Sequence, residues 1–318
     1  MNPSFLITGG HGFVGAALAA ALSPKYPVTT VSRCCKGMDS TCLALDQILE
    51  ADDSELLVRG IAPSCLVHCA ALAHRSPPRT ADEYRTLDEV NISLAVRLAS
   101  LAKRTGIKRF IFISSIGVHG SSSSSTRPIC EESPICPTNP YALSKSIAEH
   151  RLRECLEGSS CELSILRPAL VYGPGMQGNL RLLIRGIDAG LPFPLGRIRN
   201  RRSFLYLGNL ISSIEAVALH PQAAGESFVV ADEETISTPQ LISSIARIRR
   251  KPCRMLPMSS RVMQVSGRLP FVGGKIDQLI DDLVVDSSKI RRQLGWRQPF
   301  TQIDAMVEAF SLSATPST

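Results

Sequence analysis

The chain has 318 residues, of which 44% are hydrophobic and 20% charged, and its formal net charge is +7 at pH 7. This composition excludes a disordered, collagen-like or coiled-coil chain. No apolar run approaches the roughly 20 residues of a membrane-spanning helix, and the N-terminus lacks the basic and apolar regions of a secretory signal. We therefore expect a globular protein of the cytoplasm, without membrane insertion and with its 10 cysteines as reduced thiols.

The excess positive charge lies in three short clusters, at residues 197–202, 247–254 and 289–292. Aromatic residues make up only 5% of the chain, and none is interleaved with these clusters. Proteins that bind single-stranded nucleic acid combine a basic groove with aromatic side chains on which bases stack. We therefore expect no nucleic-acid partner and favour a small ligand that carries phosphate.

Short apolar runs rich in β-branched residues alternate with helical stretches through the first two-thirds of the chain. In chain order, we expect strands at 5–8, 28–32, 65–70, 109–114 and 162–167, and helices at 15–22, 94–105 and 139–157. This alternation is typical of a parallel sheet, and nearly continuous apolar strands indicate that helices cover both of its faces. The pattern predicts an α/β fold with a Rossmann-type doubly wound parallel sheet.

The pattern loosens after about residue 174, where glycine and proline cluster around residues 186–196. Shorter helices are expected at 210–219, 238–248 and 276–283. We interpret residues 1–173 as a dinucleotide-binding domain. Residues 174–318 are expected to form mainly a smaller C-terminal α/β substrate lobe, with some strands returning to the main sheet.

A glycine-rich turn, Thr8-Gly9-Gly10-His11-Gly12-Phe13-Val14-Gly15, lies between the first expected strand and the first expected helix. Gly9 permits the tight turn, Gly12 lets the backbone approach a pyrophosphate, and Gly15 lets helix and strand pack closely. The free amides and partial positive charge of the helix N-terminus then face the phosphates. This turn predicts a dinucleotide site.

The residues at the end of the second expected strand indicate whether the protein binds NAD or NADP. An acidic residue there would accept hydrogen bonds from the ribose hydroxyls of NAD, but this chain has Ser32-Arg33-Cys34-Cys35-Lys36. Since Arg33 could pair with a 2′-phosphate, NADP(H) is favoured, and NAD(H) is the alternative. Asp46 is a candidate for contact with the adenine.

Tyr141 and Lys145 lie one turn apart on one face of the helix expected at 139–157. A phenol with its usual pKa of about 10 transfers protons poorly at neutral pH. A neighbouring ammonium is expected to lower the pKa of Tyr141 toward the working pH, where proton transfer is most efficient. Ser115, at the end of an earlier strand, could bond the same substrate oxygen, so the three residues form a candidate set for proton transfer.

Together with the glycine turn, these residues resemble the extended short-chain dehydrogenase/reductase family, in the branch that acts on nucleotide-activated sugars. The similarity runs over nearly the whole chain. Its motifs are Thr8-Gly9, Gly12 and Gly15; Cys69-Ala70-Ala71; Asn91; Ser114-Ser115-Ile116-Gly117-Val118-His119-Gly120; Pro140-Tyr141-Ala142-Leu143-Ser144-Lys145; Leu166-Arg167-Pro168-Ala169-Leu170-Val171-Tyr172-Gly173-Pro174-Gly175; and Leu294-Gly295-Trp296.

The resemblance implies a role for each matching residue. Tyr141 would be the acid/base, Lys145 its partner and a ligand of the nicotinamide ribose, and Ser115 the hydroxyl donor to the substrate. Asn91 would help to set the helix that carries Lys145. The cofactor-binding residues implied in this way are Gly9, Gly12, Phe13, Val14, Gly15, Ala70, Ala71, Asn91, Tyr141, Lys145, Pro168 and Val171. His119 stands where the family often has Tyr, and this departure is expected to alter sugar contacts.

The same family binds the nucleotide sugar with a loop Asn and a downstream Arg, which implies substrate contacts for Asn179 and Arg202. An arginine suits phosphate because its rigid fork makes two parallel hydrogen bonds. Arg197 and Arg199 are further candidates. His74 is expected to contact the sugar or to pack beside it, and no metal is expected, because no second histidine stands at ligand spacing.

The tracts 194–203 and 284–291 narrow the resemblance to bacterial surface-polysaccharide enzymes that reduce UDP-4-keto-6-deoxy-N-acetylglucosamine. This similarity implies NAD(P)H-dependent reduction of a C4 keto group, in O-antigen synthesis. The alternative is a UDP-hexose or UDP-N-acetylhexosamine 4-epimerase with bound NAD, and a third interpretation is a catalytically inert cofactor-binding regulator. Arg33 favours the reductase. The resemblance also implies a homodimer that forms through the helices at 94–103 and 141–156.

Overall fold

A seven-stranded parallel sheet forms the body of the molecule. The computed structural model describes residues 3–33, 42–45, 49, 63–73, 77–123, 126–258 and 279–311. The strand order in the main sheet is β3-β2-β1-β4-β5-β6-β9, and every neighbouring pair is parallel. The chain therefore has the doubly wound Rossmann-type fold that its sequence predicts.

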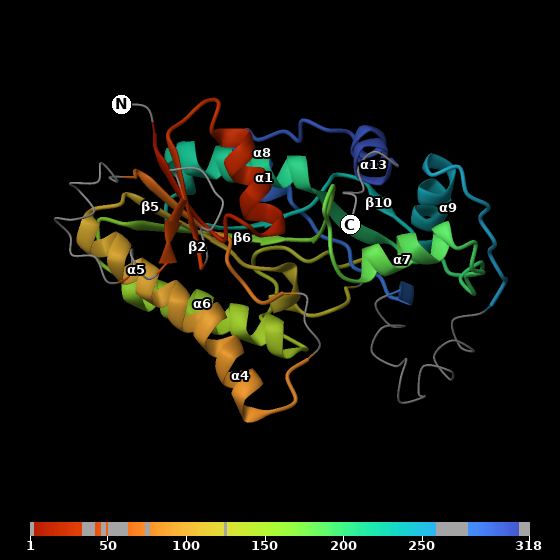
Figure 1. Ribbon diagram of the computed structural model, residues 1–318, viewed down its shortest axis with the longest axis horizontal. Coiled ribbons are helices and arrows are strands. Elements are labelled where there is room, and N and C mark those ends of the chain that lie inside the picture. The colour runs from red at the N-terminus through yellow and green to blue at the C-terminus, as the bar shows by residue number, and fades with distance from the viewer. Residues whose placement is uncertain are drawn as a thin grey trace.

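The elements follow the chain in the order of Figure 1. The strands are β1 (Phe5–Thr8), β2 (Val28–Ser32), β3 (Cys42–Ala44), β4 (Cys65–His68), β5 (Arg109–Ile113), β6 (Glu162–Pro168), β7 (Leu170–Tyr172), β8 (Arg202–Tyr206), β9 (Ser227–Val230) and β10 (Thr235–Ile236). The helices are α1 (Phe13–Leu22), α4 (Ala81–Asp88), α5 (Leu94–Thr105), α6 (Pro140–Leu156), α7 (Asn179–Asp188), α8 (Leu207–Leu219), α9 (Thr238–Ile248), α12 (Ser288–Leu294) and α13 (Gln302–Phe310). Short helical turns are η1 (Glu89–Ser93), η2 (Ile116–His119) and η3 (Pro221–Ala223).

Two apolar clusters cover the two faces of the main sheet, because successive residues of a strand point to opposite sides. Phe5 and Ile7 of β1 pack in one cluster with Leu18 of α1 and residues of α8. Leu6 of the same strand packs in the other cluster with Leu98 of α5 and residues of α6. Figure 1 shows α1 and α8 on one side of the sheet and α5 and α6 on the other.

A second, smaller sheet lies in the C-terminal half, with the order β10-β8-β7. Its apolar cluster joins Tyr172 and Phe204 to residues of α7, α9 and α13, and the ring of Phe310 stacks on Tyr172 at 5.7 Å between centroids. Phe13, the first residue of α1, also packs against this cluster. The glycine turn before α1 therefore lies where the main sheet meets the smaller lobe.

Most expected elements of the first half are confirmed to within two residues at each end. The helix expected at 276–283 is wrong at its C-terminal end, and residues 276–278 lie outside the described residues. Leu283 is extended beside β8: its amide donates to the Arg201 carbonyl at 2.9 Å, and its carbonyl accepts from the Ser203 amide at 2.8 Å. Residues 279–280 are helical, so the helix ends before Leu283, which forms an isolated bridge with Arg202 instead.

Within the described ranges, no helix has both the length and the apolar character needed to cross a membrane.

Candidate active site

The glycine turn between β1 and α1 is close-packed against the next strand connection. Gly9 has φ of +73°, and a Cβ at this position would lie 2.8 Å from the Ala70 amide nitrogen. A Cβ at Gly15 would overlap the Gly9 carbonyl oxygen. Both positions therefore need glycine, and the segment at Ala70 and Ala71 lies directly against the turn.

The N-terminus of α1 presents backbone donors that no side chain caps. Gly12 is the N-cap residue, and it makes no side-chain cap hydrogen bond. No acidic residue stands in the first turn of α1, whose first residues are Phe13 and Val14. A cap without a side chain, free N–H groups and the helix dipole suit a phosphate group. This cradle fits the dinucleotide that the sequence predicts.

The carboxyl edge of the neighbouring strands carries further polar groups. Arg33 is exposed and follows β2, which pairs with β1, so it lies on the same edge as the glycine turn. Thr8 Oγ1 and His68 Nδ1 lie 2.7 Å apart, and burial lowers the pKa of His68 to about 3, which keeps the ring neutral. Among the described residues, Ser32 Oγ and His68 Nε2 are buried without a hydrogen-bond partner. The candidates Asp46 and His74 lie outside the described residues.

Ser115 and the start of α6 meet at the end of β5. The Ser115 hydroxyl accepts a 3.1 Å hydrogen bond from the Gly117 amide and caps η2. Asn139 caps α6 by accepting from the Ala142 amide at 2.9 Å. A Cβ at Gly117 would lie 3.3 Å from Ser115 Oγ and 3.4 Å from Ala142 Cβ, so Ser115 lies close to the first turn of α6, which carries Tyr141.

Lys145 is buried and Tyr141 is half-buried. Burial raises the pKa of Tyr141 to about 12 and lowers the pKa of Lys145 to about 8. The Lys145 amine donates a 2.8 Å hydrogen bond to the Ile113 carbonyl and lies 4.5 Å from the centre of the Phe112 ring. The expected lowering of the Tyr141 pKa is wrong for this arrangement, because burial disfavours the phenolate and Lys145 directs its amine to β5.

Asn91 connects this region to the glycine-turn side of the sheet. It is fully buried in η1, accepts from the Leu72 amide at 2.8 Å, and donates to Ser144 Oγ at 2.9 Å. Ser144 precedes Lys145, so Asn91 ties the helix with Lys145 to the segment after Ala71. Pro168 and Val171, the candidates for the nicotinamide side, lie at the end of β6 and in β7.

The structure separates the two residues expected to bind the nucleotide sugar. Asn179 is exposed and begins α7, beyond the carboxyl end of β7. Arg202 begins β8, which runs parallel to β7, so it lies at the opposite end of this strand pair. Its guanidinium is buried and donates to the Asp281 carbonyl at 2.8 Å.

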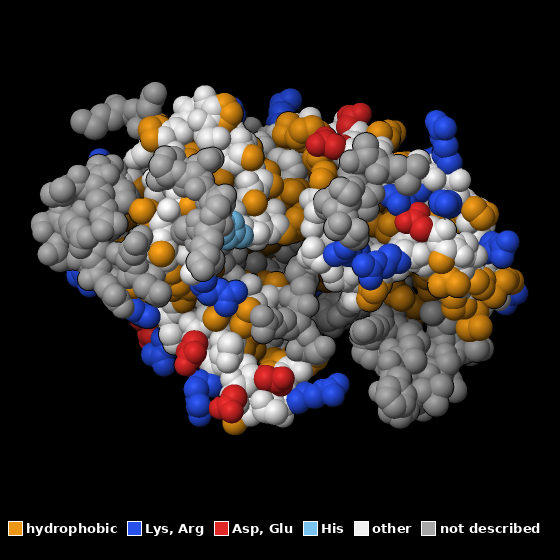
Figure 2. Space-filling view, viewed as in Figure 1, with side chains coloured by type: hydrophobic (Ala, Val, Ile, Leu, Met, Phe, Trp, Pro, Cys, Tyr) orange, Lys and Arg blue, Asp and Glu red, His pale blue; other side chains and the backbone are white. Residues whose placement is uncertain are grey.

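A polar pocket of about 580 Å³ lies between the loop after η2 and the smaller lobe. It is lined by Ser122, Ser123, Arg197, Ile198, Arg199, Asn200, Ile280, Asp281 and Asp282. Arg197 and Arg199 therefore share one pocket, and Arg202 is not among its lining residues. On the face seen in Figure 2, described Lys and Arg side chains lie in separate patches.

One further residue of the expected site, His119, differs in position from its expectation. His119 does not point outward to a sugar: it is 8% exposed, and its ring contacts Pro134 and Arg167. The part of the chain that the structure describes holds no group of three or more His, Cys, Asp or Glu side chains that could bind a metal ion.

The parallel sheet, the uncapped glycine turn and the Ser115–Tyr141–Lys145 set define a protein of the short-chain dehydrogenase/reductase class. The chain belongs to the NAD dependent epimerase/dehydratase family, whose family model matches residues 5–231. The chain is therefore a member of a family of NAD-dependent enzymes and has the dinucleotide-binding Rossmann-type fold.

Known proteins are similar over most of this chain. A UDP-glucose 4-epimerase of Vibrio cholerae is 36% identical over 305 residues, covering 95% of this chain and 92% of that protein. An N-acetyl-alpha-D-glucosaminyl-diphospho-ditrans,octacis-undecaprenol 4-epimerase of Escherichia coli O157:H7 is 26% identical and covers 81% of this chain and 76% of its own length. The crystal structure of UDP-glucuronic acid 4-epimerase from Bacillus cereus has a TM-score of 0.75 at 22% identity, covering 96% of this chain and 98% of that one, and it supports the fold.

Proposed function

We propose that this protein reduces the C4 keto group of a UDP-4-keto-6-deoxy-N-acetylhexosamine with NADPH, in surface-polysaccharide (O-antigen) synthesis. Ser115, Tyr141 and Lys145 at the carboxyl end of β5 support hydride chemistry at a sugar carbon, and the exposed Arg33 after β2 is the observation that favours NADPH and hence the reductase. The carboxyl end of β5 lies on the edge of the sheet where β1 leads into the uncapped glycine turn. In open α/β sheets, ligands bind outside the carboxyl ends of the strands.

Each of the three side chains has a distinct proposed task. When bound at the glycine turn, the nicotinamide cofactor would supply the hydride. The Tyr141 hydroxyl donates a proton to the alkoxide oxygen that develops at C4, and the Ser115 hydroxyl donates a hydrogen bond to the same oxygen. An ammonium has three N–H donors, so the bond from Lys145 to Ile113 leaves two for the ribose and for Tyr141.

The residues proposed to bind the cofactor lie along the same carboxyl edge of the main sheet. Gly9, Gly12 and Gly15 shape the turn, and the amides of Phe13 and Val14 face the phosphates. Ala70 and Ala71 would border the dinucleotide on one side, and Pro168 and Val171 on the nicotinamide side. The buried Asn91 would act on the cofactor site through its bonds to Leu72 and Ser144. We assign the 2′-phosphate of NADP to Arg33, because this exposed guanidinium, and no carboxylate, directly follows β2.

The nucleotide sugar is proposed to extend toward the smaller lobe. Asn179 at the start of α7 remains a candidate for its recognition. For the diphosphate, Arg197 and Arg199 are better placed than Arg202, because they line the open pocket whereas Arg202 is buried on the Asp281 carbonyl. A fork-shaped guanidinium binds phosphate oxygens in pairs.

A second candidate is 4-epimerisation of a UDP-hexose or UDP-N-acetylhexosamine with tightly bound NAD. The relatives from Vibrio cholerae and Escherichia coli O157:H7 are both named as 4-epimerases. Both activities use a hydride step and an acid/base at C4. They differ in whether the hydride returns to the same sugar, which then needs no net supply of reduced cofactor.

We also propose a homodimer that forms through α5 and α6. The outer face of α6 exposes Leu143 by 49% and Ile147 by 37%, four residues apart on one side of the helix. Light scattering coupled to gel filtration tests this: a monomer at micromolar concentration would contradict it.

The test of the proposed function is NADPH oxidation by the purified protein with UDP-4-keto-6-deoxy-N-acetylglucosamine made by an upstream dehydratase. Rapid oxidation with NADPH and slow oxidation with NADH supports the reductase. No oxidation, together with NAD released on denaturation and interconversion of UDP-glucose and UDP-galactose, supports the epimerase. A dehydratase-free mixture controls for background oxidation.

A further inference from the structure

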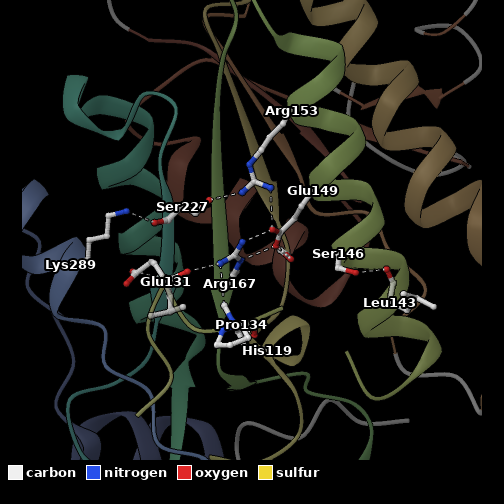
Figure 3. A network of polar contacts seen from close by, with 12 residues as sticks. His119, Glu131, Pro134, Leu143, Ser146, Glu149, Arg153, Arg167, Ser227 and Lys289 are labelled. Carbon is white, nitrogen blue, oxygen red and sulfur yellow. Dashed lines mark hydrogen bonds and ion pairs between the residues drawn. The ribbon is translucent and has the colours of Figure 1, made fainter. Parts of the chain in front are cut away.

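A buried ionic network joins Glu149 of α6 to Arg167 of β6 (Figure 3). The Glu149 and Arg167 side chains are only 3% and 5% exposed, and their closest oxygen and nitrogen lie 2.6 Å apart. Glu149 Oε1 accepts from Ser114 Oγ at 2.6 Å and from Arg167 Nε at 3.0 Å, while Oε2 accepts from Arg167 Nη2. The remaining guanidinium nitrogen, Nη1, donates to His119 Nε2 at 3.1 Å. We call Ser114, His119, Glu149 and Arg167 the Glu149 network.

Each member of the Glu149 network lies within four residues, along the chain, of a residue of the candidate site. Ser114 precedes Ser115, and His119 ends the turn that Ser115 caps. Glu149 lies one turn after Lys145 on α6, and Arg167 precedes Pro168 at the end of β6. The network therefore connects the Ser115 turn, α6 and β6 at the places where each contributes to the site.

The hydrogen-bond partners of His119 define which of its ring nitrogens carries a proton. A guanidinium only donates hydrogen bonds, so His119 Nε2 must accept from Arg167. The Pro134 carbonyl, 3.1 Å from Nδ1, only accepts, so the proton lies on Nδ1. Burial and the Arg167 charge lower the pKa of His119, although Glu149 opposes them. His119 is thus a neutral acceptor for Arg167 Nη1, which also donates to the Glu131 carbonyl at 3.5 Å.

A buried ion pair is weak evidence for stability, because an apolar packing of the same volume often stabilises a fold equally well. Such pairs can instead select one arrangement among several. Here the selected arrangement is the contact of the Ser115 turn with α6, which places Ser115 near the first turn of the helix.

We propose that Glu149 and Arg167 are positioning residues: they hold the Ser114–Ser115 turn against α6, so that Ser115 and Tyr141 face one substrate oxygen. This inference rests on the proposed function. A displacement of about 1 Å in such a set costs on the order of 100-fold in rate. Neither side chain is expected to touch the substrate, because both are buried behind the turn.

Arg109 supplies a matched control. It is also a buried arginine, at the amino end of β5, and it donates to two carbonyls, of Val217 and His220, and to Glu162. Arg109→Met and Arg167→Met thus remove similar bonds at opposite ends of the sheet. Both variants are expected to lose thermal stability. Only Arg167→Met and Glu149→Gln are expected to lower kcat, by about 10- to 100-fold, with the KM for the sugar and the Kd for NADPH within about threefold.

Variants of His119 test the same inference if Arg167→Met and Glu149→Gln do not fold. His119→Leu removes the nearer of the two acceptors of Arg167 Nη1, the other being the Glu131 carbonyl at 3.5 Å, and is expected to lower kcat. In His119→Gln an amide oxygen can accept from Arg167 and should restore most of the kcat. Two results would overturn the positioning role. One is a kcat loss in Arg167→Met no larger than that in Arg109→Met, and the other is an equal effect of His119→Leu and His119→Gln on kcat.

Hydrogen exchange of the backbone amides at 114–120 separates this inference from the proposed function. Gly117 donates its amide to Ser115 Oγ and Val118 donates to the Ser115 carbonyl. Arg167→Met should speed exchange here by about tenfold, and Arg109→Met should not. If the wild-type protein turns over none of the sugars, the proposed function fails. The exchange rates still test whether Arg167 holds the Ser115 turn, because equal rates in Arg167→Met and Arg109→Met contradict that role.

Discussion

The amine of Lys145 donates its hydrogen bond to the carbonyl of Ile113, the last residue of β5, over a distance of 2.8 Å. The side chain is 1% exposed, and burial lowers the pKa of Lys145 to about 8, although Cys69 and Glu149 act in the opposite direction. A cation at this position is held by the backbone of the strand that ends at Ser115. Its charge therefore depends on pH within the range in which the protein can be assayed.

The lowered pKa of Lys145 predicts a stability that rises with pH. Between about pH 8 and 10.5, the unfolded chain binds more protons at this lysine than the folded chain does, so the free energy of unfolding increases with pH. Relative to Lys145→Met, the wild-type protein should gain roughly 2 kcal/mol between about pH 7.5 and 9.5. Urea unfolding of both proteins at several pH values measures the difference. A difference that stays constant over this range contradicts a lysine with a lowered pKa.

Removal of the Tyr141 hydroxyl should stop proton transfer without disturbing cofactor binding. Tyr141→Phe is expected to lower kcat by about 10²- to 10⁴-fold, the usual contribution of a general acid. The Kd for NADPH should stay within about twofold, because only one hydroxyl is lost. Tyr84→Phe is the control, since Tyr84 is 46% exposed on α4. Turnover of Tyr141→Phe at the wild-type rate would remove Tyr141 from the mechanism.

The first half of the fold follows closely from local signals in the sequence. Strands such as β4 and β5 are uninterrupted apolar runs because both faces of a parallel sheet are buried. Gly106 ends α5 in the left-handed conformation that its residue type favours. Asn139 and Pro140 mark the start of α6 as an N-cap and a first-turn proline.

The second half was less predictable, because its elements depend on distant partners. Helix α7 was missed: it follows Gly178 without a side-chain cap and lies in a stretch interrupted by glycine and proline. Arg202 matches a family motif, yet its guanidinium bonds the Asp281 carbonyl, 79 residues away. No pattern around Arg202 specifies that contact.

The Glu149 network was also missed, although one signal for it exists. Glu149 lies at the same helical spacing after Lys145 as Lys145 does after Tyr141, which places all three on one face of α6. A carboxylate on a face that is otherwise buried needs a cationic or hydroxyl partner. The partners, Ser114 and Arg167, come from two strands that only the assembled sheet brings together.

Alanine substitutions in the glycine turn should separate fold from cofactor binding. Gly15→Ala forces a Cβ onto the Gly9 carbonyl and is expected to cost about 1–3 kcal/mol of stability. Gly12 has φ of −78°, and a Cβ there meets only the Gly9 carbonyl, at 3.1 Å. Gly12→Ala should therefore cost about 1 kcal/mol or less, yet weaken dinucleotide binding about 10- to 100-fold because the Cβ blocks the pyrophosphate.

Thermal unfolding and nucleotide titration of both glycine variants measure these effects. The expected contrast is a near-normal melting temperature with weak binding in Gly12→Ala, and losses in both quantities in Gly15→Ala. Normal dinucleotide affinity in Gly12→Ala would place the pyrophosphate elsewhere.

The exposed Arg33 should decide between the two dinucleotides. A hydrogen-bonded contact with a charged group contributes about 1.5–3 kcal/mol, so Arg33→Ala is expected to raise the Kd for NADPH by about 10- to 100-fold. The Kd for NADH should change by less than about twofold, because NADH lacks the 2′-phosphate. Fluorescence titration of the reduced nucleotides measures both constants, and Arg85→Ala, an exposed arginine on α4, controls for the loss of one surface charge. Equal effects on both nucleotides, or tighter binding of NADH by the wild-type protein, would exclude a 2′-phosphate contact at Arg33 and favour the epimerase with resident NAD.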